Sequence, residues 1–254
     1  RLDGDIRRRL VLENDGSVYT VSEVLALCQE LGTPAVYDNL HNALHPAGPS
    51  LPDAHWIGLC AQTWKTADGA QKIHYSQPHP VKPRGAHSDF IAIDPFLDFY
   101  HSLPAYELAI MLEVKDKNLS ALKCILCSSP CSFSALEAEW ARYKYSVLEK
   151  SPSAYQEIRE LFKNKRADSA LAFYRLVEDA LSLCEDKGRA ENALEHVWGY
   201  FSNLATAAEQ ARYRKKLSCY LDGACSLAQV KSTLRTLAEK YRISYLLGSY
   251  YFTL

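Results

Sequence analysis

The first half of this 254-residue chain alternates short apolar runs with helical patterns four times over, and this order constrains the fold more than any other feature. We predict the corresponding strands at residues 10–13, 34–38, 71–74 and 109–113. The helical patterns that follow them lie at residues 19–31, 54–65, 94–102 and 119–127. A repeated strand–helix order predicts a parallel sheet with crossover helices. A closed (β/α)8 barrel needs about eight such units, so we expect about half of a barrel.

The second half has a different character, which begins after a segment rich in Ser, Pro and Cys at residues 128–134. Its apolar residues recur at helical spacing with almost no strand signal. These helical patterns cover residues 135–148, 153–163, 167–185, 190–204, 207–221 and 227–241. We therefore predict an α/β domain over residues 1–127, a linker over 128–137 and an all-helical domain over 138–254.

The composition excludes several classes of protein. With 48% hydrophobic and 23% charged residues the chain is globular rather than disordered. The sequence has no uncharged apolar run of about 18 residues and no signal peptide, so we expect no membrane partner. Eight cysteines without a secretory signal favour a reducing cytoplasm. The chain begins with Arg1 rather than Met, so we expect it to be part of a longer protein or a processed product.

Potential ligands or acid–base groups stand at the end of each predicted strand: Glu13, Asp38, Lys72 with His74, and Glu113. Since the carboxyl ends of parallel strands open toward the same βα loops, these side chains are expected to lie on one side of the sheet. Seven of the eight histidines also fall in the first half. A mixture of carboxylates and imidazoles suits Mn²⁺, Zn²⁺ or Fe²⁺ better than a calcium or thiolate site.

The candidate metal ligands are Glu13, Asp38, His41, His74, His87 and Glu113. Several ligands in one cleft allow more than one ion, and paired ions can clamp the attacking and leaving oxygens of a phosphodiester. Ligand chemistry alone leaves other enzymes open, namely an abasic-site nuclease like endonuclease IV or a sugar isomerase. Each carboxylate taken singly is equally consistent with a strand-end residue that the neighbouring backbone satisfies.

Five blocks of the first half resemble the UV damage endonuclease family in order and spacing. They are RLVLEND at residues 9–15, PAVYDNLH at 34–41, KIHYS at 72–76, RGAHSD at 84–89 and MLEVKDK at 111–117. The resemblance spans about residues 5–125 and implies a TIM-barrel fold. It also implies a phosphodiester hydrolase that nicks damaged double-stranded DNA 5′ to pyrimidine dimers and 6-4 photoproducts. Several divalent ions are implied, with Mn²⁺ favoured over Zn²⁺ or Mg²⁺.

The resemblance also implies roles for single residues. It makes the six candidates above metal ligands, and it places Lys72, sometimes carboxylated in the family, with Glu13 and Glu113 at the catalytic cluster. Lys72 shares a strand face with His74, two residues on. Hydroxyl groups and cations near the cluster are candidate DNA contacts: Tyr75, Ser76, Arg84, Lys115 and Lys117. Asp89 is a candidate for orienting His87.

The first four units of the family's barrel have no counterpart in this sequence, so we expect an incomplete metal cluster and an open sheet edge. One interpretation is the C-terminal part of a longer endonuclease, inactive as this piece alone. The alternative is a half barrel without activity that serves as a nucleic-acid-binding or scaffold protein. Because this half of the barrel retains every ligand expected in it, the first interpretation is favoured.

The helical half resembles the helical domain of YbgA-like proteins at residues 143–155, 188–201 and 245–252. The resemblance implies an accessory role beside a catalytic domain, one that would suit binding of nucleic acid. Lys144, Arg189, His196 and Tyr200 are candidates for a small phosphate-binding patch, with Tyr145 and Trp198 as stacking surfaces. The competing interpretation is that aromatic residues at helical spacing are simply core.

Overall fold

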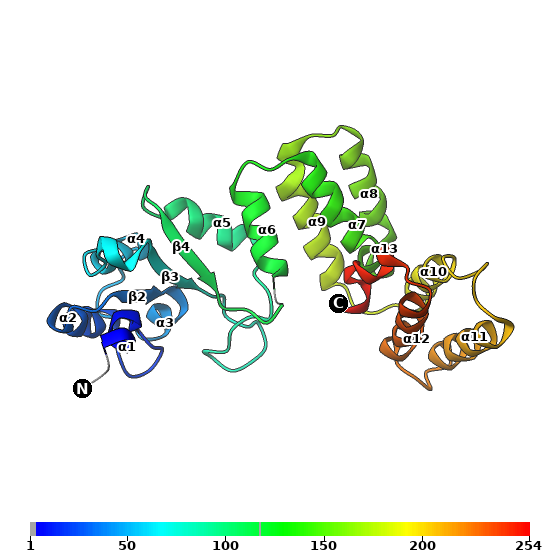
Figure 1. Ribbon diagram of the computed structural model, residues 1–254, viewed down its shortest axis with the longest axis horizontal. Helices are drawn as coiled ribbons and strands as arrows, with labels where there is room; N and C mark the ends of the chain where they lie inside the picture. The colour runs from blue at the N-terminus through cyan, green and yellow to red at the C-terminus, as the bar shows by residue number, and fades with distance from the viewer. Residues whose placement is uncertain (1–3, 117) are drawn as a thin grey trace. The chain divides into compact units, whose positions relative to one another are not determined.

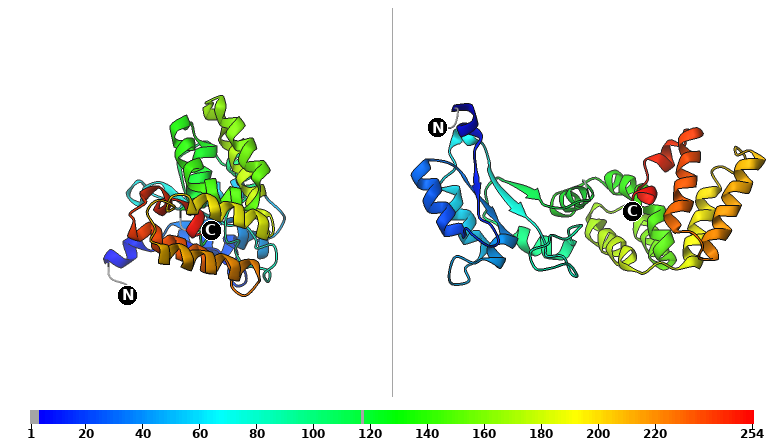
Figure 2. Two further views of the ribbon diagram at one scale, coloured as in Figure 1. Left: turned by 90° about the vertical axis from the view of Figure 1, so that its right-hand side faces the viewer. Right: turned by 90° about the horizontal axis from the view of Figure 1, so that it is seen from below.

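The computed structural model describes residues 4–116 and 118–254, and the chain divides between Ser128 and Ser129 into two compact units (Figure 1). Strands are confined to the first unit, drawn in blue to green, whereas residues 129–254, all described, form helices and turns only (Figure 2). No helix of the described residues is both long and apolar enough to span a membrane.

The first unit contains a four-stranded parallel sheet whose strands follow one another in chain order. They are β1 (Leu12–Glu13), β2 (Ala35–Asp38), β3 (Gln71–Tyr75) and β4 (Leu108–Leu112). In the register, Glu13 is opposite Val36, Asp38 is opposite His74, and His74 is opposite Met111. The predicted strand–helix alternation and parallel pairing are therefore confirmed, and the carboxyl ends of the strands share one edge of the sheet.

Among the described residues, six α-helices accompany this sheet: α1 (Gly4–Arg9), α2 (Val21–Leu31), α3 (Asn39–Leu44), α4 (Asp53–Ala61), α5 (Ile93–Ser102) and α6 (Leu119–Ser128). A short 3-10 helix covers Thr66–Asp68. Thr20 and Glu23 form the predicted capping box of α2, and Gly32 ends this helix in the left-handed conformation. The sequence predicted neither α1 nor α3, because six residues are too few to show a helical period.

The two faces of β3 differ in burial. Along β3, Gln71, Ile73 and Tyr75 are buried, while Lys72 is exposed and His74 is partly exposed. Helices α2 and α4 pack against β2, whose residues are all buried. The buried face therefore forms the core, and the alternation of a strand leaves Lys72 and His74 on the opposite face.

The second unit consists of α7 (Phe133–Lys150), α8 (Pro152–Lys163), α9 (Ala170–Ser182), α10 (Lys187–Trp198), α11 (Ala207–Leu221), α12 (Leu227–Lys240) and α13 (Ser244–Leu247). Two 3-10 helices lie at Ala167–Ser169 and Tyr250–Phe252. The helices predicted at 167–185 and 190–204 are shorter in the structure. The predicted linker is also shorter, because Ser132 caps α7 and only residues 129–132 separate it from α6.

Several aromatic residues pack among the aliphatic side chains of the core of the second unit. The rings of Trp198 and Tyr213 are stacked at 4.4 Å between centroids and 3° between planes. Phe173, Tyr174 and Phe201 are fully buried. Trp198 and Tyr145 are 5% and 4% exposed, so both belong to this core and neither offers the predicted stacking surface.

Candidate metal centre

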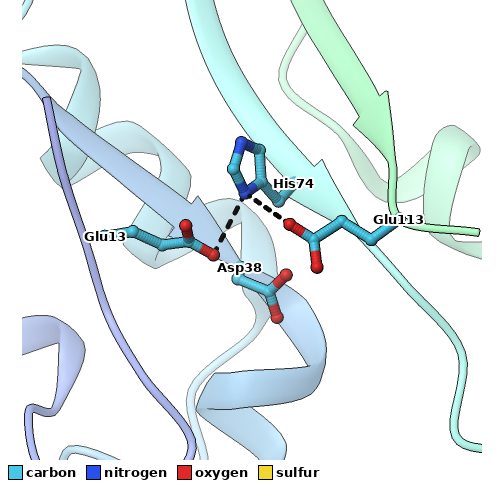
Figure 3. A group of neighbouring side chains, drawn as sticks. All are labelled: Glu13, Asp38, His74 and Glu113. Atoms are coloured by element: carbon cyan, nitrogen blue, oxygen red, sulfur yellow. Dashed lines mark ion pairs between the residues drawn. The ribbon is translucent and has the colours of Figure 1, made fainter. Parts of the chain in front are cut away.

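The structure brings all six predicted ligands to the carboxyl edge of the sheet. One ligand atom from each of Glu13, Asp38, His74 and Glu113 lies within 4.8 Å of the others. Figure 3 shows the His74 imidazole between the carboxylates of Glu13 and Glu113, with Asp38 turned toward the same space. The Nδ1 atom of His74 is 3.0 Å from Oε1 of Glu13 and 3.0 Å from Oε1 of Glu113.

His41 and His87 complete the group from its two sides. The Nδ1 atom of His41 lies 3.4 Å from Oε1 of Glu13 and 3.7 Å from Oδ1 of Asp38. The Nδ1 atom of His87 lies 3.2 Å from Oε2 of Glu113. The two imidazole rings are 5.8 Å apart. Three carboxylates and three imidazoles therefore form one cluster.

Local backbone structure explains why these residues converge. Asp38 ends β2 and also caps α3, since its Oδ1 accepts a hydrogen bond from the backbone N–H of His41 at 2.7 Å. This cap sets the position of His41 one turn into the helix. Glu113 directly follows β4, and its N–H donates to the carbonyl of Tyr75. A bridge between Pro78 and His87 folds the intervening loop back toward the sheet.

Three side-chain amides hold this edge together, and the sequence did not single them out. Asn14 donates to the carbonyl of Asp38 at 3.0 Å and accepts from its N–H at 2.9 Å. Asn39 makes the same two hydrogen bonds with the backbone of Ser76, at 3.0 and 2.9 Å. Gln77 does so with Ala92, at 3.0 and 2.8 Å. We call these residues the amide clamps.

Two of the amide clamps directly follow a ligand in the sequence, Asn14 after Glu13 and Asn39 after Asp38. Each pairs with the backbone of the next strand's end, as a further strand residue would. Asn14 is 1% exposed. In the sequence, these two amide clamps can therefore be found as an Asn that directly follows a candidate ligand at the end of a strand.

The electrostatics of the cluster are dominated by its own members. Burial alone would raise the pKa of Glu13, but contacts with His41 and His74 outweigh it and lower that pKa to about 2. The Glu13 carboxylate in turn raises the pKa of His41 to about 9 and also raises that of His74. Burial raises the pKa of Asp38, which is 0% exposed.

The residues fit a divalent cation. Oε1 of Glu13, Oδ2 of Asp38 and Nδ1 of His74 are buried and make no well-aligned hydrogen bond, although Nδ1 of His74 lies 3.0 Å from Oε1 of Glu13. Such orphaned atoms carry a desolvation cost unless a cation or a donor satisfies them. Here they face one another, and their oxygen and imidazole chemistry suits Mn²⁺, Zn²⁺ or Fe²⁺. Lys72 is exposed on the same sheet face as His74 and forms no ion pair with the carboxylates among the described residues.

The structure argues against two of the expected DNA contacts. Tyr75 is 3% exposed, because it packs on Phe96 and Phe99 in the core. Ser76 is 0% exposed. Both residues are therefore inaccessible to a nucleic acid in this structure.

Other candidate contacts have different surroundings. Arg84 is exposed and donates to the carbonyl of Leu44, and Lys115 is exposed. Lys117 lies outside the described residues. The expectation for Asp89 is wrong, because its carboxylate contacts Lys82 at 2.9 Å and His79 at 3.4 Å instead of His87.

The expected patch of the helical unit is only partly assembled. His196 and Tyr200 are exposed, and Lys144 is half-buried. Arg189 contacts Asp186 at 3.7 Å and donates to the carbonyl of Cys184, so its guanidinium is held at the start of α10. Tyr200 reaches Tyr145 instead, with 2.8 Å between their hydroxyl oxygens.

A parallel β/α sheet with carboxylates and imidazoles at its carboxyl edge places the first unit in the class of β/α proteins with a candidate metal centre. Comparison with known families is more specific. The family described as UV-endonuclease UvdE matches residues 1–139. The chain belongs to this family. A second family, described only as a protein of unknown function (DUF1722), matches residues 144–254.

Individual relatives agree with this assignment. The chain is 29% identical to a UV DNA damage endonuclease of Clostridium perfringens over 224 residues, which cover 86% of this chain and 53% of that protein. It is 32% identical to a UV DNA damage endonuclease of Bacillus mycoides over 127 residues, covering 49% of this chain and 39% of that protein. The chain spans about half the length or less of these relatives.

A solved structure described as "Crystal Structure of SacUVDE" is 38% identical and has a TM-score of 0.44, covering 48% of this chain and 40% of that chain. The alignment with the Clostridium protein is longer than the 139 residues of the first family match. Similarity to that relative therefore extends into the helical unit.

Proposed function

We propose that this chain carries the metal-binding half of a DNA repair endonuclease that nicks damaged double-stranded DNA 5′ to UV photoproducts. The observation that supports this proposal is the convergence of Glu13, Asp38, His74 and Glu113, with His41 and His87 beside them. Membership in the UV-endonuclease UvdE family supplies the reaction class. Mn²⁺ is the proposed ion, with Zn²⁺ and Mg²⁺ as alternatives, and more than one ion is proposed.

Divalent cations bound here would supply a nucleophile from water at neutral pH and offset the negative charge of the phosphodiester. Glu13 and Glu113 flank His74, so in this proposal these three side chains would hold a divalent cation together. Asp38 is held rigidly by Asn14 and by its own cap on α3, which fixes its carboxylate toward the cluster. Lys72 is proposed to act at the rim of the cluster, on the face that His74 occupies.

Nicking of supercoiled plasmid tests the reaction. Irradiated, abasic and undamaged plasmids are compared in Mn²⁺, using both this chain and the full reading frame that encodes it. We expect damage-dependent nicking by the full protein. Glu13→Gln and His74→Ala are expected to lower the nicking rate by more than about 100-fold. Losing a residue that only supports a metal ligand costs about 10- to 100-fold, and these two residues are proposed as the ligands themselves. His101→Ala is the matched control, because His101 is exposed on α5.

Preference for abasic plasmid would support the endonuclease IV-like alternative. If neither this chain nor the full protein nicks irradiated plasmid, the endonuclease proposal is contradicted. The alternative of a nucleic-acid-binding or scaffold protein would then stand.

Metal binding has a readout that does not depend on activity. A ligand at 100 times its Kd stabilises the folded state by about 2.7 kcal/mol. Mn²⁺ is therefore expected to slow hydrogen exchange in β2 and β3 but not in α10 or α12. The His74→Ala protein is expected to lose this protection, and equal protection in both proteins would contradict the metal centre.

A further inference from the structure

Four tyrosines gather on the second unit outside the candidate metal centre. Tyr145 lies on α7, Tyr155 on α8, Tyr200 just after α10, and Tyr245 on α13. The rings of Tyr200 and Tyr245 are 5.9 Å apart and nearly parallel, with 14° between their planes. Tyr145 meets both edge-on, at 6.2 and 6.4 Å. We call these four residues the tyrosine cluster.

The cluster is anchored on its inner side and open on its outer side. Tyr145 is 4% exposed, and its hydroxyl group is hydrogen-bonded to that of Tyr200. Tyr200 and Tyr245 are 36% and 38% exposed. The protein thus holds two parallel aromatic rings in place and leaves part of each in contact with water. A large, rigid aromatic surface loses little conformational entropy when a ligand covers it.

Two cations lie over the rings of this cluster. The Nζ atom of Lys144 is 5.5 Å from the ring centre of Tyr145, and the guanidinium of Arg159 is 5.9 Å from that of Tyr155. Neither forms an ion pair with a carboxylate among the described residues, and Arg159 donates instead to the side chain of Gln156.

The other cations over aromatic rings of the second unit are all neutralised. Arg142, Arg214, Lys231 and Lys240 each form an ion pair with a glutamate: Glu139, Glu195, Glu149 and Glu209 in that order. Among the described residues, the two unneutralised cations of this kind therefore both belong to the tyrosine cluster. An anionic ligand would neutralise these two cations, as glutamates neutralise the other cations over aromatic rings in this unit.

We propose that the two exposed rings of the tyrosine cluster, Tyr200 and Tyr245, stack unpaired bases of a nucleic acid strand while Lys144 and Arg159 attract its phosphates. Proteins that bind single strands combine aromatic platforms with cations along the backbone. An apolar protein partner would use the rings but leave both cations unneutralised. The proposal deepens the proposed function, and the choice of nucleic acid as the anion rests on it.

Fluorescence anisotropy with labelled oligothymidylate and oligouridylate of about 12 nucleotides tests the proposal. EDTA is present throughout, so the candidate metal centre does not contribute. Saturable binding is expected, and Tyr200→Leu and Tyr245→Leu are each expected to weaken it about tenfold. Tyr200→Phe keeps the ring and is expected to bind within about twofold of the unchanged protein. The two oligonucleotides distinguish DNA from RNA as the source of the strand.

Tyr19→Leu is the matched control, because Tyr19 is 58% exposed on the first unit. Circular dichroism checks that each variant remains helical, and Tyr245→Leu serves alone if Tyr200→Leu unfolds. Replacing Lys144 or Arg159 by Ala is expected to reduce the slope of log affinity against log salt by about 0.7 each.

Three results would overturn the proposal. The first is an absence of saturable binding, and the second is an equal loss in Tyr19→Leu. The third is a Leu variant that changes only sedimentation, which assigns the surface to a second copy of the chain. If the unchanged protein nicks damaged plasmid but binds neither oligonucleotide, the result counts against the tyrosine cluster alone. Retained binding without nicking supports the tyrosine cluster and counts against the endonuclease.

Discussion

The two units treat buried and partly buried carboxylates in opposite ways. In the second unit, Glu149 is 4% exposed and lies 3.0 Å from Nζ of Lys231, whose side chain is 11% exposed. In the first unit, Glu13, Asp38 and Glu113 face imidazoles instead. A lysine carries its charge at any ordinary pH, whereas an imidazole carries one only when protonated.

This difference separates a structural use of buried charge from a functional one. A carboxylate with a permanent cation forms a closed pair, and removing either partner leaves a charge stranded in a medium of low polarity. Carboxylates that face one another and titratable imidazoles form an open group, which a metal cation can complete. Removing the negative charge of a carboxylate is therefore expected to lower stability in the second unit and to raise that of the metal-free first unit.

The largest effect is expected from Glu149→Ala. Removing this carboxylate leaves the Lys231 ammonium buried against the Tyr251 ring, 4.4 Å from its centre. We expect the second unit to lose about 3–5 kcal/mol of unfolding free energy. The urea dependence of hydrogen exchange in α7 and α12 measures it. Glu157→Ala, at an exposed position of α8, is the control and is expected to change stability by less than about 0.5 kcal/mol. A similar small change in Glu149→Ala would remove the contrast between the units.

The next effect is expected from Asn14→Ala in the first unit. This change removes both hydrogen bonds to the backbone of Asp38 and leaves its buried N–H and C=O without these partners. We expect a loss of about 2 kcal/mol in unfolding free energy. Mn²⁺ affinity, measured by titration calorimetry, is expected to fall about tenfold because Asp38 is less well held. Asn203→Ala, in an exposed turn of the second unit, is expected to change neither quantity. Unchanged Mn²⁺ affinity in Asn14→Ala would show that the clamp only stabilises the fold.

A smaller effect of opposite sign is expected from Asp38→Asn. Burial raises the pKa of this carboxyl, so its charged form costs more free energy in the folded state than in the unfolded chain. Asn retains the ability to cap α3. We expect the metal-free protein to gain about 1 kcal/mol of unfolding free energy while losing Mn²⁺ affinity. Asp98→Asn, exposed on α5, is the control for urea unfolding in EDTA. A loss of stability in Asp38→Asn would contradict the view that this carboxylate lacks a stabilising cation in the metal-free protein.

The smallest effect concerns pH and the second unit. The Lys240 ammonium, with the N–H of Thr206 and the hydroxyl of Tyr241, lowers the pKa of Glu209 to about 2 from an ordinary value of 4.5. A lowered pKa stabilises the fold above about pH 4.5, and this contribution is lost as the pH falls through about 2. Glu209→Gln retains the capping box. We therefore expect its melting temperature to be lower than that of the unchanged protein at pH 7 and equal to it near pH 2. A difference that persists at pH 2 would exclude the charge as its cause.

The sequence predicted those parts of the structure that repeat or that carry distinctive chemistry. Strand–helix alternation indicated the parallel sheet, and the metal-binding residue types at the strand ends indicated the members of the cluster. The alternation of a strand could also have corrected one expectation. Because His74 faces the cluster, its neighbour Tyr75 had to face the core.

The rest depends on contacts without a periodic signal. The six-residue helix α3 and the amide clamps arise from single hydrogen bonds between side chains and backbone, such as that from His41 to Asp38. Asp89 lies two residues from His87, yet it pairs with Lys82 because the loop path decides the partner. The helical unit's patch depended on side chains from different helices, so helical spacing within α10 could not place Lys144 or Arg189.

The amide clamps also bear on how freely this protein can change over evolution. Asn14 and Asn39 tie the ends of adjacent strands directly to each other, so the spacing of Glu13, Asp38 and His74 does not depend on the turns that leave the sheet. Insertions in the exposed stretch at residues 48–52 are then free to accumulate without displacing those three side chains. A lineage can therefore vary what surrounds the cluster, and with it the range of molecules that reach it, while the cluster itself stays in place.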